Sequence, residues 1–340
     1  MITEAAPDSL IKPLGKAWYQ PLSLQLKVLQ KQRRLPHAVL LSFPGETSEL
    51  AFLWHLSMHL LCRDSDDGQP CGQCASCHLM LANAYPDFKL VALEYDAGNK
   101  KVNKNIKVEQ VRGLIREVYL THSYDNLKIA VIYPADKMSM ASANSLLKTL
   151  EEPAENVLII LATHQPGKIP VTIRSRCQPW NLCLPATAEA LAWLQAEGID
   201  HDNAAQYLEL ANGDPSLAAR LHAIQYADLV ADFKKQFTQY LKNQIDVVAL
   251  CRCLTVNQTE LVRRLVFMVI KAYCQKYSGL QDAPIKKAPA RAMLDLMVRM
   301  QRQLMTEENN LDTQLQLEDV LIAIKQIIIS QSANHSVRLR

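Results

Sequence analysis

Four cysteines lie close together in the first quarter of the 340-residue sequence. They follow the spacing Cys62-x8-Cys71-x2-Cys74-x2-Cys77. Four thiolates can close a tetrahedral shell around Zn²⁺, and a shell made only of protein ligands keeps no open position for a substrate. The spacing therefore predicts a structural zinc module at about residues 62–77.

Two other chemistries remain open for these thiols. The run from Cys71 to Cys77 is similar to the ligand run of bacterial ferredoxins, although Leu81 stands where the next ligand of that pattern would be. A redox protein with an iron–sulfur centre is therefore one alternative, and a group of free thiols is another. A disulfide framework is not expected, because the other five of the nine cysteines are scattered along the chain.

A second group of residues stands where a phosphate-binding loop would follow an apolar run at residues 37–43. A working loop reads G-x-x-x-x-G-K-[ST], in which the Lys neutralises phosphate charge and the hydroxyl holds Mg²⁺. Here one glycine remains, Gly45, and it is followed by Glu46 and Thr47. The Lys is absent, and Glu46 and Glu49 place negative charge where phosphates would lie. The loop is therefore expected to be degenerate.

The acidic pair that would hold Mg²⁺ is missing as well. Such a pair is expected at the end of an apolar strand at residues 128–133, where Tyr133 and Pro134 stand instead. Asp136 lies further along and is expected to cap the next helix. Because two elements of one ATP site are lost, we expect this chain neither to bind nor to hydrolyse ATP.

These residues are positioned by a predicted α/β domain. Apolar runs rich in β-formers alternate with segments of helical periodicity, which predicts βαβ units and a parallel sheet buried on both faces. The expected strands are residues 37–43, 87–94, 128–133, 156–163 and 178–184. The expected helices between them are residues 51–62, 108–120 and 139–152.

Helical periodicity replaces the strand pattern after about residue 185. A breaker at Asn212-Gly213-Asp214-Pro215 and a second break near 224–227 divide this half of the chain. The expected organisation is an α/β domain at 1–184, a small helical domain at 185–226 and a larger helical domain at 227–340. In the last of these, the apolar run at 319–329 is expected to form a buried helix.

The composition is that of a soluble globular protein, with 49% hydrophobic and 21% charged residues. The net charge of +3 permits contact with nucleic acid without arguing for it. No apolar run of about 20 residues suggests a membrane span. The first residues lack the pattern of a signal peptide, so a cytoplasmic location is expected.

Three motifs in the α/β half resemble those of clamp-loader subunits of the AAA+ family. Residues 146–153 read LLKTLEEP, residues 160–163 are similar to the sensor 1 strand with Thr163 at the sensor position, and residues 175–177 read Ser-Arg-Cys. Their order and spacing match that family, as does a cysteine module between the first two strands. An intact Ser-Arg-Cys motif beside a degenerate phosphate loop resembles the delta prime members of this family, rather than gamma/tau or delta.

The resemblance implies a fold and a function. The fold is an AAA+ (RecA-like) parallel-sheet domain with a zinc-binding insertion, an all-helical lid and an all-helical collar for oligomerisation. The function is that of a non-catalytic subunit that assembles with gamma/tau and delta and donates Arg176 as an arginine finger to a neighbouring ATP site. The complex would load the beta sliding clamp onto primed DNA as part of the DNA-directed DNA polymerase III holoenzyme, whose polymerase activity belongs to the complex.

Two other functions remain open. One is an ATP-hydrolysing AAA+ subunit with a divergent phosphate loop, which Mg²⁺-dependent ATP turnover by the purified chain would support. The other is a stand-alone zinc-dependent DNA-binding protein. Its DNA contact could involve the basic run Lys100, Lys101, Lys104 and Lys107, and its DNA affinity would be tight and salt-sensitive.

Overall fold

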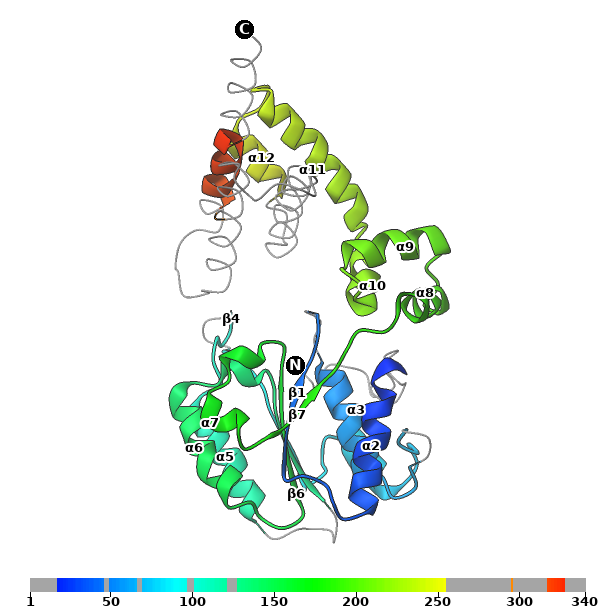
Figure 1. The fold of residues 1–340 in the computed structure, drawn as a ribbon, viewed down its shortest axis with the longest axis vertical. Helices are drawn as coiled ribbons and strands as arrows, with labels where there is room; N and C mark the ends of the chain where they lie inside the picture. Colours follow the sequence, from blue (N-terminus) through cyan, green and yellow to red (C-terminus); the bar gives the residue numbers. More distant parts are fainter. Residues whose placement is uncertain are drawn as a thin grey trace, which may run out of the picture. The chain divides into compact units, whose positions relative to one another are not determined.

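The computed structural model describes residues 17–45, 49–65, 69–96, 101–120, 127–254, 295 and 317–327. The chain is divided into two compact units, residues 1–222 and 223–340. The first unit contains the β-sheet and three helices that follow it (Figure 1). The finer division into domains at 1–184, 185–226 and 227–340 stays a prediction.

A five-stranded parallel sheet forms the centre of the first unit (Figure 1). Its strands are β1 (Ala38–Ser42), β2 (Phe88–Val91), β5 (Lys128–Ile132), β6 (Val157–Thr163) and β7 (Gln178–Asn181). Their order in the sheet is β2-β5-β6-β1-β7, and each falls within a strand expected from the apolar runs. A separate antiparallel pair joins β3 (Tyr95–Asp96) to β4 (Lys101–Val102). This architecture confirms the expected α/β domain with a parallel sheet.

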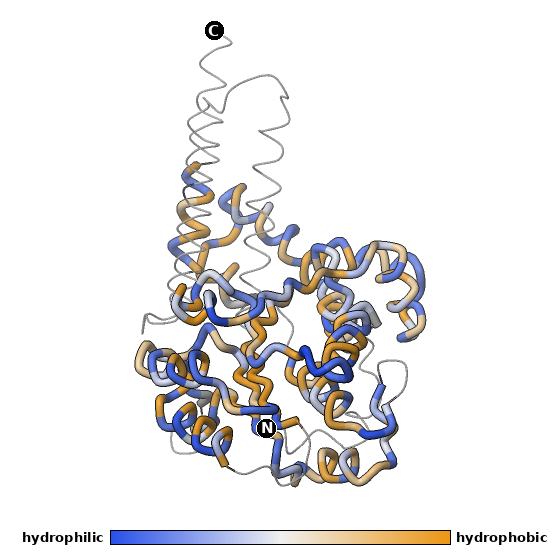
Figure 2. Tube along the Cα trace, turned by 60° about the horizontal axis from the view of Figure 1, so that its bottom comes forward, coloured by the Kyte–Doolittle hydropathy of each residue, from blue (hydrophilic) through white to orange (hydrophobic). Residues whose placement is uncertain are grey.

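Helices cover both faces of the sheet (Figure 1). One face carries α2 (Gln20–Lys31) and α3 (Leu50–Leu61), and the other carries α5 (Val108–Tyr119), α6 (Met140–Glu151) and α7 (Val171–Arg174). Successive strand residues serve the two faces in turn: Val39 and Leu41 belong to one apolar core, Ala38 and Leu40 to the other. Because both of their faces are covered, the central strands β5, β6 and β1 are almost entirely buried. They form a hydrophobic centre in Figure 2.

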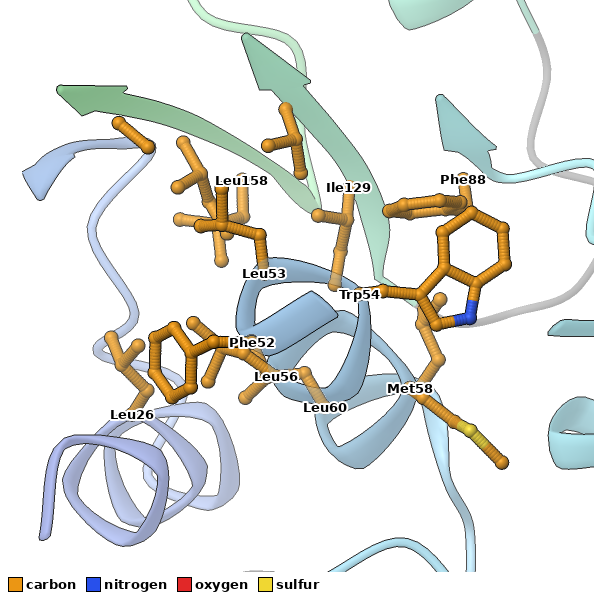
Figure 3. Close-up of a cluster of buried hydrophobic side chains, with 14 of the residues drawn as sticks. Leu26, Phe52, Leu53, Trp54, Leu56, Met58, Leu60, Phe88, Ile129 and Leu158 are labelled. Atoms are coloured by element: carbon orange, nitrogen blue, oxygen red, sulfur yellow. The ribbon is translucent and has the colours of Figure 1, made fainter. Parts of the chain in front are cut away.

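The helix α3 is the most deeply packed helix of the sheet domain. Its Leu53 and Leu56 are fully buried, and its Trp54 meets Phe88 of β2 edge to face with ring centroids 4.9 Å apart (Figure 3). Burial on all sides holds this helix firmly against the sheet. Glu49 precedes this helix and Cys62 follows it, so α3 positions residues of both the expected nucleotide site and the expected zinc site.

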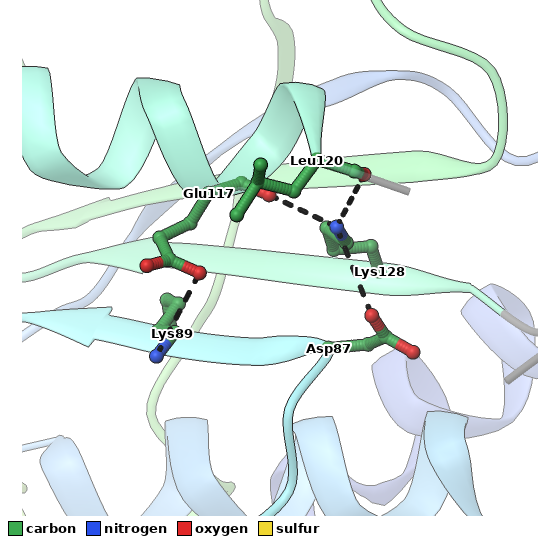
Figure 4. Close-up of polar contacts among 5 residues, drawn as sticks. All are labelled: Asp87, Lys89, Glu117, Leu120 and Lys128. Carbon is green, nitrogen blue, oxygen red and sulfur yellow. Dashed lines mark hydrogen bonds and ion pairs between the residues drawn. The ribbon is translucent and has the colours of Figure 1, made fainter. Parts of the chain in front are cut away.

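A buried lysine connects the end of α5 to the start of β5 (Figure 4). Lys128, the first residue of β5, donates hydrogen bonds to the carbonyl oxygens of Glu117 (2.9 Å) and Leu120 (2.8 Å). Its Nζ also lies 3.7 Å from the carboxylate of Asp87, and both side chains are buried. The ammonium therefore satisfies carbonyls that the helix end leaves without intrahelical partners.

Three short helices follow β7 in the first unit. They are α8 (Thr187–Ala196), α9 (His201–Leu210) and α10 (Pro215–Ala223). The breaker expected at residues 212–215 is confirmed, since Asn212 and Gly213 both have positive φ and α10 begins at Pro215. Trp193 of α8 meets Trp18 edge to face, with centroids 5.6 Å apart, which packs these helices against the start of α2.

The second unit is helical where the structure describes it. It contains α11 (Tyr226–Leu241), α12 (Val247–Leu254) and a helix at residues 317–327. Leu321 and Ile324 are fully buried, which agrees with the buried helix expected at 319–329 over the part that is described. The rest of the expected collar lies outside the described residues. Among the helices that are described, none has the length and apolar character needed to cross a bilayer.

Candidate functional site

The four cysteines predicted to bind zinc come together at the end of α3. Cys62 directly follows α3, Cys74 directly precedes α4 (Ala75–Leu81), and Cys77 lies within α4. With Cys71, their Sγ atoms all lie within 4.8 Å of one another, and all four are free thiols. The structure thus brings together every member of the predicted ligand set.

The sulfur positions fit a tetrahedral metal ion. The Sγ atoms of Cys62 and Cys74 are 3.8 Å apart, and those of Cys71 and Cys77 are 3.9 Å apart. With Zn–S bonds of about 2.3 Å, the edge of a tetrahedral shell measures about 3.8 Å. Burial raises the pKa of the Cys62 and Cys77 thiols, so these sulfurs keep their protons unless a cation displaces them. The donor set therefore suits a divalent ion such as zinc.

A lysine from α2 supports the ligand at the end of α3. The Lys27 ammonium donates hydrogen bonds to the carbonyl oxygens of His59 (3.2 Å), Leu60 (3.0 Å) and Cys62 (2.9 Å). These contacts fix the backbone from which Cys62 projects. A four-thiolate shell around a divalent ion carries excess negative charge, and the nearby ammonium offsets part of it.

A tyrosine joins two positions of the nucleotide site that the sequence predicts to be degenerate. Tyr133 follows β5, and its hydroxyl accepts a hydrogen bond from the backbone N–H of Glu49 at 3.3 Å, directly before α3. The same hydroxyl lies 3.1 Å from Nε2 of His164, which follows β6. Backbone N–H groups at this kind of helix start are the usual ligands of phosphate. One hydrogen bond thus joins Glu49 and Tyr133, which both belong to the expected degenerate site. Glu46 and Thr47 lie outside the described residues.

Aromatic rings fill the space next to this contact. Tyr19, at the end of a short 3-10 helix (Ala17–Tyr19), lies 4.8 Å from Phe52 and 5.7 Å from Phe43 between ring centroids. Phe43 in turn lies 5.9 Å from His164. The Tyr19, Phe43 and Phe52 rings are all buried. Packed side chains therefore occupy the volume beside the loop that would hold a nucleotide.

Two buried carboxylates lie near the Tyr19 ring. Glu49 and Asp214 are 1% and 3% exposed. Gly45 has φ +79°, and a Cβ at this position would overlap the Asp214 carboxylate, so only glycine fits there. Burial raises the pKa of Tyr19, and the charges of Glu49 and Asp214 raise it further. The same charges would repel the phosphates of a nucleotide.

The structure corrects one expectation at the sensor 1 strand. Asp136 does not cap α6, because it lies in a 3-10 helix (Ala135–Lys137) and accepts a hydrogen bond from Thr163 Oγ1 at 2.5 Å. The cap of α6 is Ser139, whose Oγ accepts from the backbone N–H of Ser142. The hydroxyl of Thr163 also accepts from the backbone N–H of Gln165 at 2.9 Å. The sensor threonine is thus committed to contacts within the chain.

Arg176 lies at the surface, between α7 and β7. Its Nη2 is 2.6 Å from Oε1 of Glu151, the last residue of α6, and its Nη1 donates to the carbonyl oxygen of Thr172 at 2.7 Å. Ile173 and Cys177 on either side of it are buried. The backbone of Arg176 is therefore anchored, while its side chain stays 35% exposed.

The sheet places Arg176 away from Tyr133 and His164. Tyr133 and His164 follow the carboxyl ends of β5 and β6, whereas Arg176 precedes the amino end of β7. The strand β7 runs parallel to β1, with Gln178 opposite Val39 and Asn181 opposite Ser42. The length of β7, roughly 13 Å at about 3.3 Å per residue, therefore separates the two positions along the sheet.

Several contributors to these sites were not foreseen from the sequence. Tyr19 and Phe52 carry no local signal, because their packing depends on long-range contacts. Asp214 was noted only as part of the breaker at residues 212–215. Its position directly before Pro215 is a recognisable helix-cap pattern, and its Oδ1 accepts from the backbone N–H of Leu217 at 3.1 Å.

Comparison with known proteins identifies the family. A family model described as "DNA polymerase III, delta subunit" matches residues 19–185. The delta' subunit of DNA polymerase III from Pseudomonas aeruginosa is 33% identical over 230 residues, which cover 67% of each chain. The delta' subunit from Yersinia pestis is 36% identical over 60% of this chain and 61% of its own length. The chain belongs to the DNA polymerase III delta' family.

The family model covers the part of the chain that holds all the predicted site residues. Its match spans the four cysteines, the degenerate loop and the Ser-Arg-Cys motif, and it ends where the helical half begins. Among solved structures, a gamma subunit-related protein of DNA polymerase III from Thermotoga maritima aligns with 89% of this chain and 99% of its own, at 16% identity and a TM-score of 0.41. The family assignment rests on the sequence relatives.

Proposed function

We propose that this chain acts in a DNA polymerase III clamp loader without binding or hydrolysing ATP itself. In this proposal it assembles with gamma/tau and delta subunits in the cytoplasm. It donates Arg176 to the ATP site of an adjacent gamma/tau subunit. The assembly then loads the beta sliding clamp onto primed DNA for replication.

The Tyr133–Glu49 hydrogen bond and the aromatic packing beside it support this proposal. A nucleotide would have to displace Tyr133 from the N–H of Glu49 and move the buried Tyr19, Phe43 and Phe52 rings. It would also have to place its phosphates beside the carboxylates of Glu49 and Asp214. Each step opposes binding, so the AAA+ fold of this chain is better suited to supporting a neighbour's ATP site than to forming one.

Arg176 has the properties of a group that acts on a neighbour. Its side chain is partly exposed, its backbone lies between buried residues, and it precedes the edge strand β7 at the end of the sheet opposite to Tyr133. A planar guanidinium can bind a γ-phosphate through two N–H groups and stabilise the charge that develops there. Arginine fingers supplied in trans raise turnover by about 10³- to 10⁵-fold in the systems where they are best measured.

The four thiols complete the proposal with a structural zinc ion. Cys62, Cys71, Cys74 and Cys77 would hold it, and the ion would supply cross-linking of α3 to α4 rather than chemistry. The closed shell keeps no coordination position for a substrate. In the proposal the zinc module therefore stabilises the first unit and takes no part in nucleotide turnover.

Reconstitution of the loader tests the role of Arg176. The complex is assembled with gamma/tau and delta, and its ATP turnover is measured with beta clamp and primed DNA. Arg176→Ala is expected to assemble normally and to lower stimulated turnover by roughly threefold or more. Arg176→Lys keeps the charge but lacks the planar pair of N–H donors, so it should restore little of the lost turnover. Arg174→Ala is the matched control, and unchanged turnover in Arg176→Ala would refute the finger assignment.

The purified chain alone tests the rival functions. Calorimetric titration with ATP and Mg²⁺ is expected to show no binding, and no phosphate should be released. Turnover by the isolated chain would instead establish an ATPase with a divergent loop. Tight DNA binding that weakens steeply with salt would favour a stand-alone DNA-binding protein.

A further inference from the structure

We propose that Glu151 is a positioning residue for Arg176, holding its guanidinium ready at the subunit surface before a neighbour docks. This inference rests on the arginine-finger role given above to Arg176. The last residue of α6 and the residue before Cys177 would then form one functional pair. The first Glu of the LLKTLEEP segment and the Arg of the Ser-Arg-Cys motif are thereby joined in one pair.

The contacts of the guanidinium carry this inference. Oε1 of Glu151 lies 2.6 Å from Nη2, and the carbonyl oxygen of Thr172 accepts from Nη1 at 2.7 Å. Two acceptors from two different helices thus fix both the position and the plane of the group. A guanidinium carries more N–H donors than these two contacts use, so donors remain for a phosphate.

Both residues project from rigid positions. Leu150, next to Glu151, is buried, and so are Ile173 and Cys177 on either side of Arg176. Their backbones cannot shift without disturbing the apolar core between α6 and the sheet. The only freedom left is in the two side chains, and the ion pair restricts that freedom.

Helix electrostatics give a reason why Glu151 needs a cationic partner. A carboxylate in the last turn of a helix faces the negative end of the helix dipole, where a cation would be preferred. Glu151 ends α6, so its charge is unfavourable for the helix on its own. The Arg176 guanidinium offsets this unfavourable charge, and the ion pair links the end of α6 to the proposed finger.

The pair is suited to orienting the guanidinium rather than locking it. The side chains of Arg176 and Glu151 are 35% and 50% exposed, so water and salt screen their attraction. A weak pair is enough to favour one orientation of a long side chain. It also allows the guanidinium to adjust when a strongly charged phosphate arrives from a neighbour.

The test uses the assembled loader with gamma/tau, delta, beta clamp and primed DNA. Glu151→Ala is compared with Glu151→Gln, which keeps an acceptor oxygen for Nη2 without the charge. Glu152→Ala is the matched control, because this exposed carboxylate is the next residue in the chain and Arg176 pairs with Glu151 instead. Arg176→Ala and the double variant Glu151→Ala/Arg176→Ala complete the set. Assembly is checked by size-exclusion chromatography.

We expect Glu151→Ala to lower the kcat for ATP by roughly two- to fivefold while the KM changes little. Glu151→Gln should recover much of the loss, and Glu152→Ala should match the wild type. In the Arg176→Ala background, Glu151→Ala should have no further effect, because Glu151 acts only through that side chain.

The possible failures are distinguishable. If Arg176→Ala leaves turnover unchanged, the finger role itself is wrong. If Arg176→Ala lowers turnover while Glu151→Ala equals or exceeds the wild type, the finger stands and the positioning role is overturned. A further loss on adding Glu151→Ala to Arg176→Ala would also overturn it, since Glu151 would then act by another route.

Discussion

The hydroxyl of Tyr133 accepts a hydrogen bond from the backbone N–H of Glu49 across 3.3 Å. Tyr133 stands where an acid would hold Mg²⁺, and Glu49 stands at the helix start where phosphate would bind. One contact therefore joins the two elements that the sequence predicts to be degenerate. Restoring either element alone would leave the other in place, so a single substitution is not expected to return nucleotide binding.

Removing that hydroxyl should cost stability without opening the pocket. Tyr133→Phe leaves the buried N–H of Glu49 without this acceptor, so the free energy of unfolding should fall by about 1 to 2 kcal/mol in urea denaturation. Tyr119→Phe is the control, because its hydroxyl bonds the carbonyl oxygen of Glu152 at an exposed position, and it should cost less than about 0.5 kcal/mol. Calorimetry should still show no ATP binding. Equal stability of the two variants would argue against the Tyr133 contact.

Much of the α/β domain was predictable because its determinants are local. Parallel strands buried on both faces are continuous apolar runs, so residues 128–133 and 156–163 could be recognised without knowing their partners. The four cysteines lie within a short segment whose spacing is itself the signal. The losses predicted at residues 45–49 and 133–134 follow from the fixed residue types that working nucleotide sites require there.

The remaining contacts depend on how distant segments meet. Asp136 was expected to cap a helix, but the fold places it against Thr163, which comes from the neighbouring strand β6. Asp214 reaches Gly45 only because the helices after β7 pack back onto the sheet domain. Glu151 likewise meets Arg176 through packing of α6 against α7. No local periodicity encodes such pairings, so only the structure shows them.

The four-thiol centre should bind one equivalent of zinc and no iron. Elemental analysis of the purified chain is expected to show zinc, and its absorbance spectrum should lack visible bands. Cys74→Ser should lose the metal and lower the free energy of unfolding by at least about 2 kcal/mol, because metal binding is coupled to folding. Cys183→Ser, at an exposed free thiol, is the control and should keep the zinc. Iron together with visible absorbance would instead show an iron–sulfur centre.

The buried lysine at the start of β5 should matter far more than an exposed neighbour. Lys128→Met removes the cation that pairs with the buried Asp87 carboxylate and bonds the end of α5, so it should cost about 3 to 5 kcal/mol of unfolding free energy. Lys89→Met is the matched control, because Lys89 pairs with Glu117 at 3.9 Å and both side chains are about half exposed. That substitution should cost no more than about 1 kcal/mol. Comparable losses, measured by urea denaturation, would contradict the structural role given to Lys128.

The cysteine of the Ser-Arg-Cys motif should resist alkylation in the folded protein. Burial raises the pKa of Cys177 from 9.0 to about 11, so below pH 9 its reactive thiolate is about a hundredfold scarcer than that of an ordinary thiol. Its labelling by iodoacetamide, followed by peptide mass spectrometry, should stay slow at pH 8 and rise as the pH approaches 11. The exposed Cys183 should label readily at pH 8, and both should label in urea.

The raised pKa of Cys177 also determines how the free energy of unfolding changes with pH. A thiol whose pKa is higher in the folded state favours folding while it is protonated, so this contribution is complete below pH 9 and is lost as the pH rises toward 11. Cys177→Ala removes the titrating group, so this variant should lose less stability than the wild type between pH 9 and pH 11. Fast labelling of Cys177 at pH 8 in the native protein would show instead that the segment beside Arg176 opens to solvent. The anchored backbone on which the arginine-finger proposal depends would then be in question.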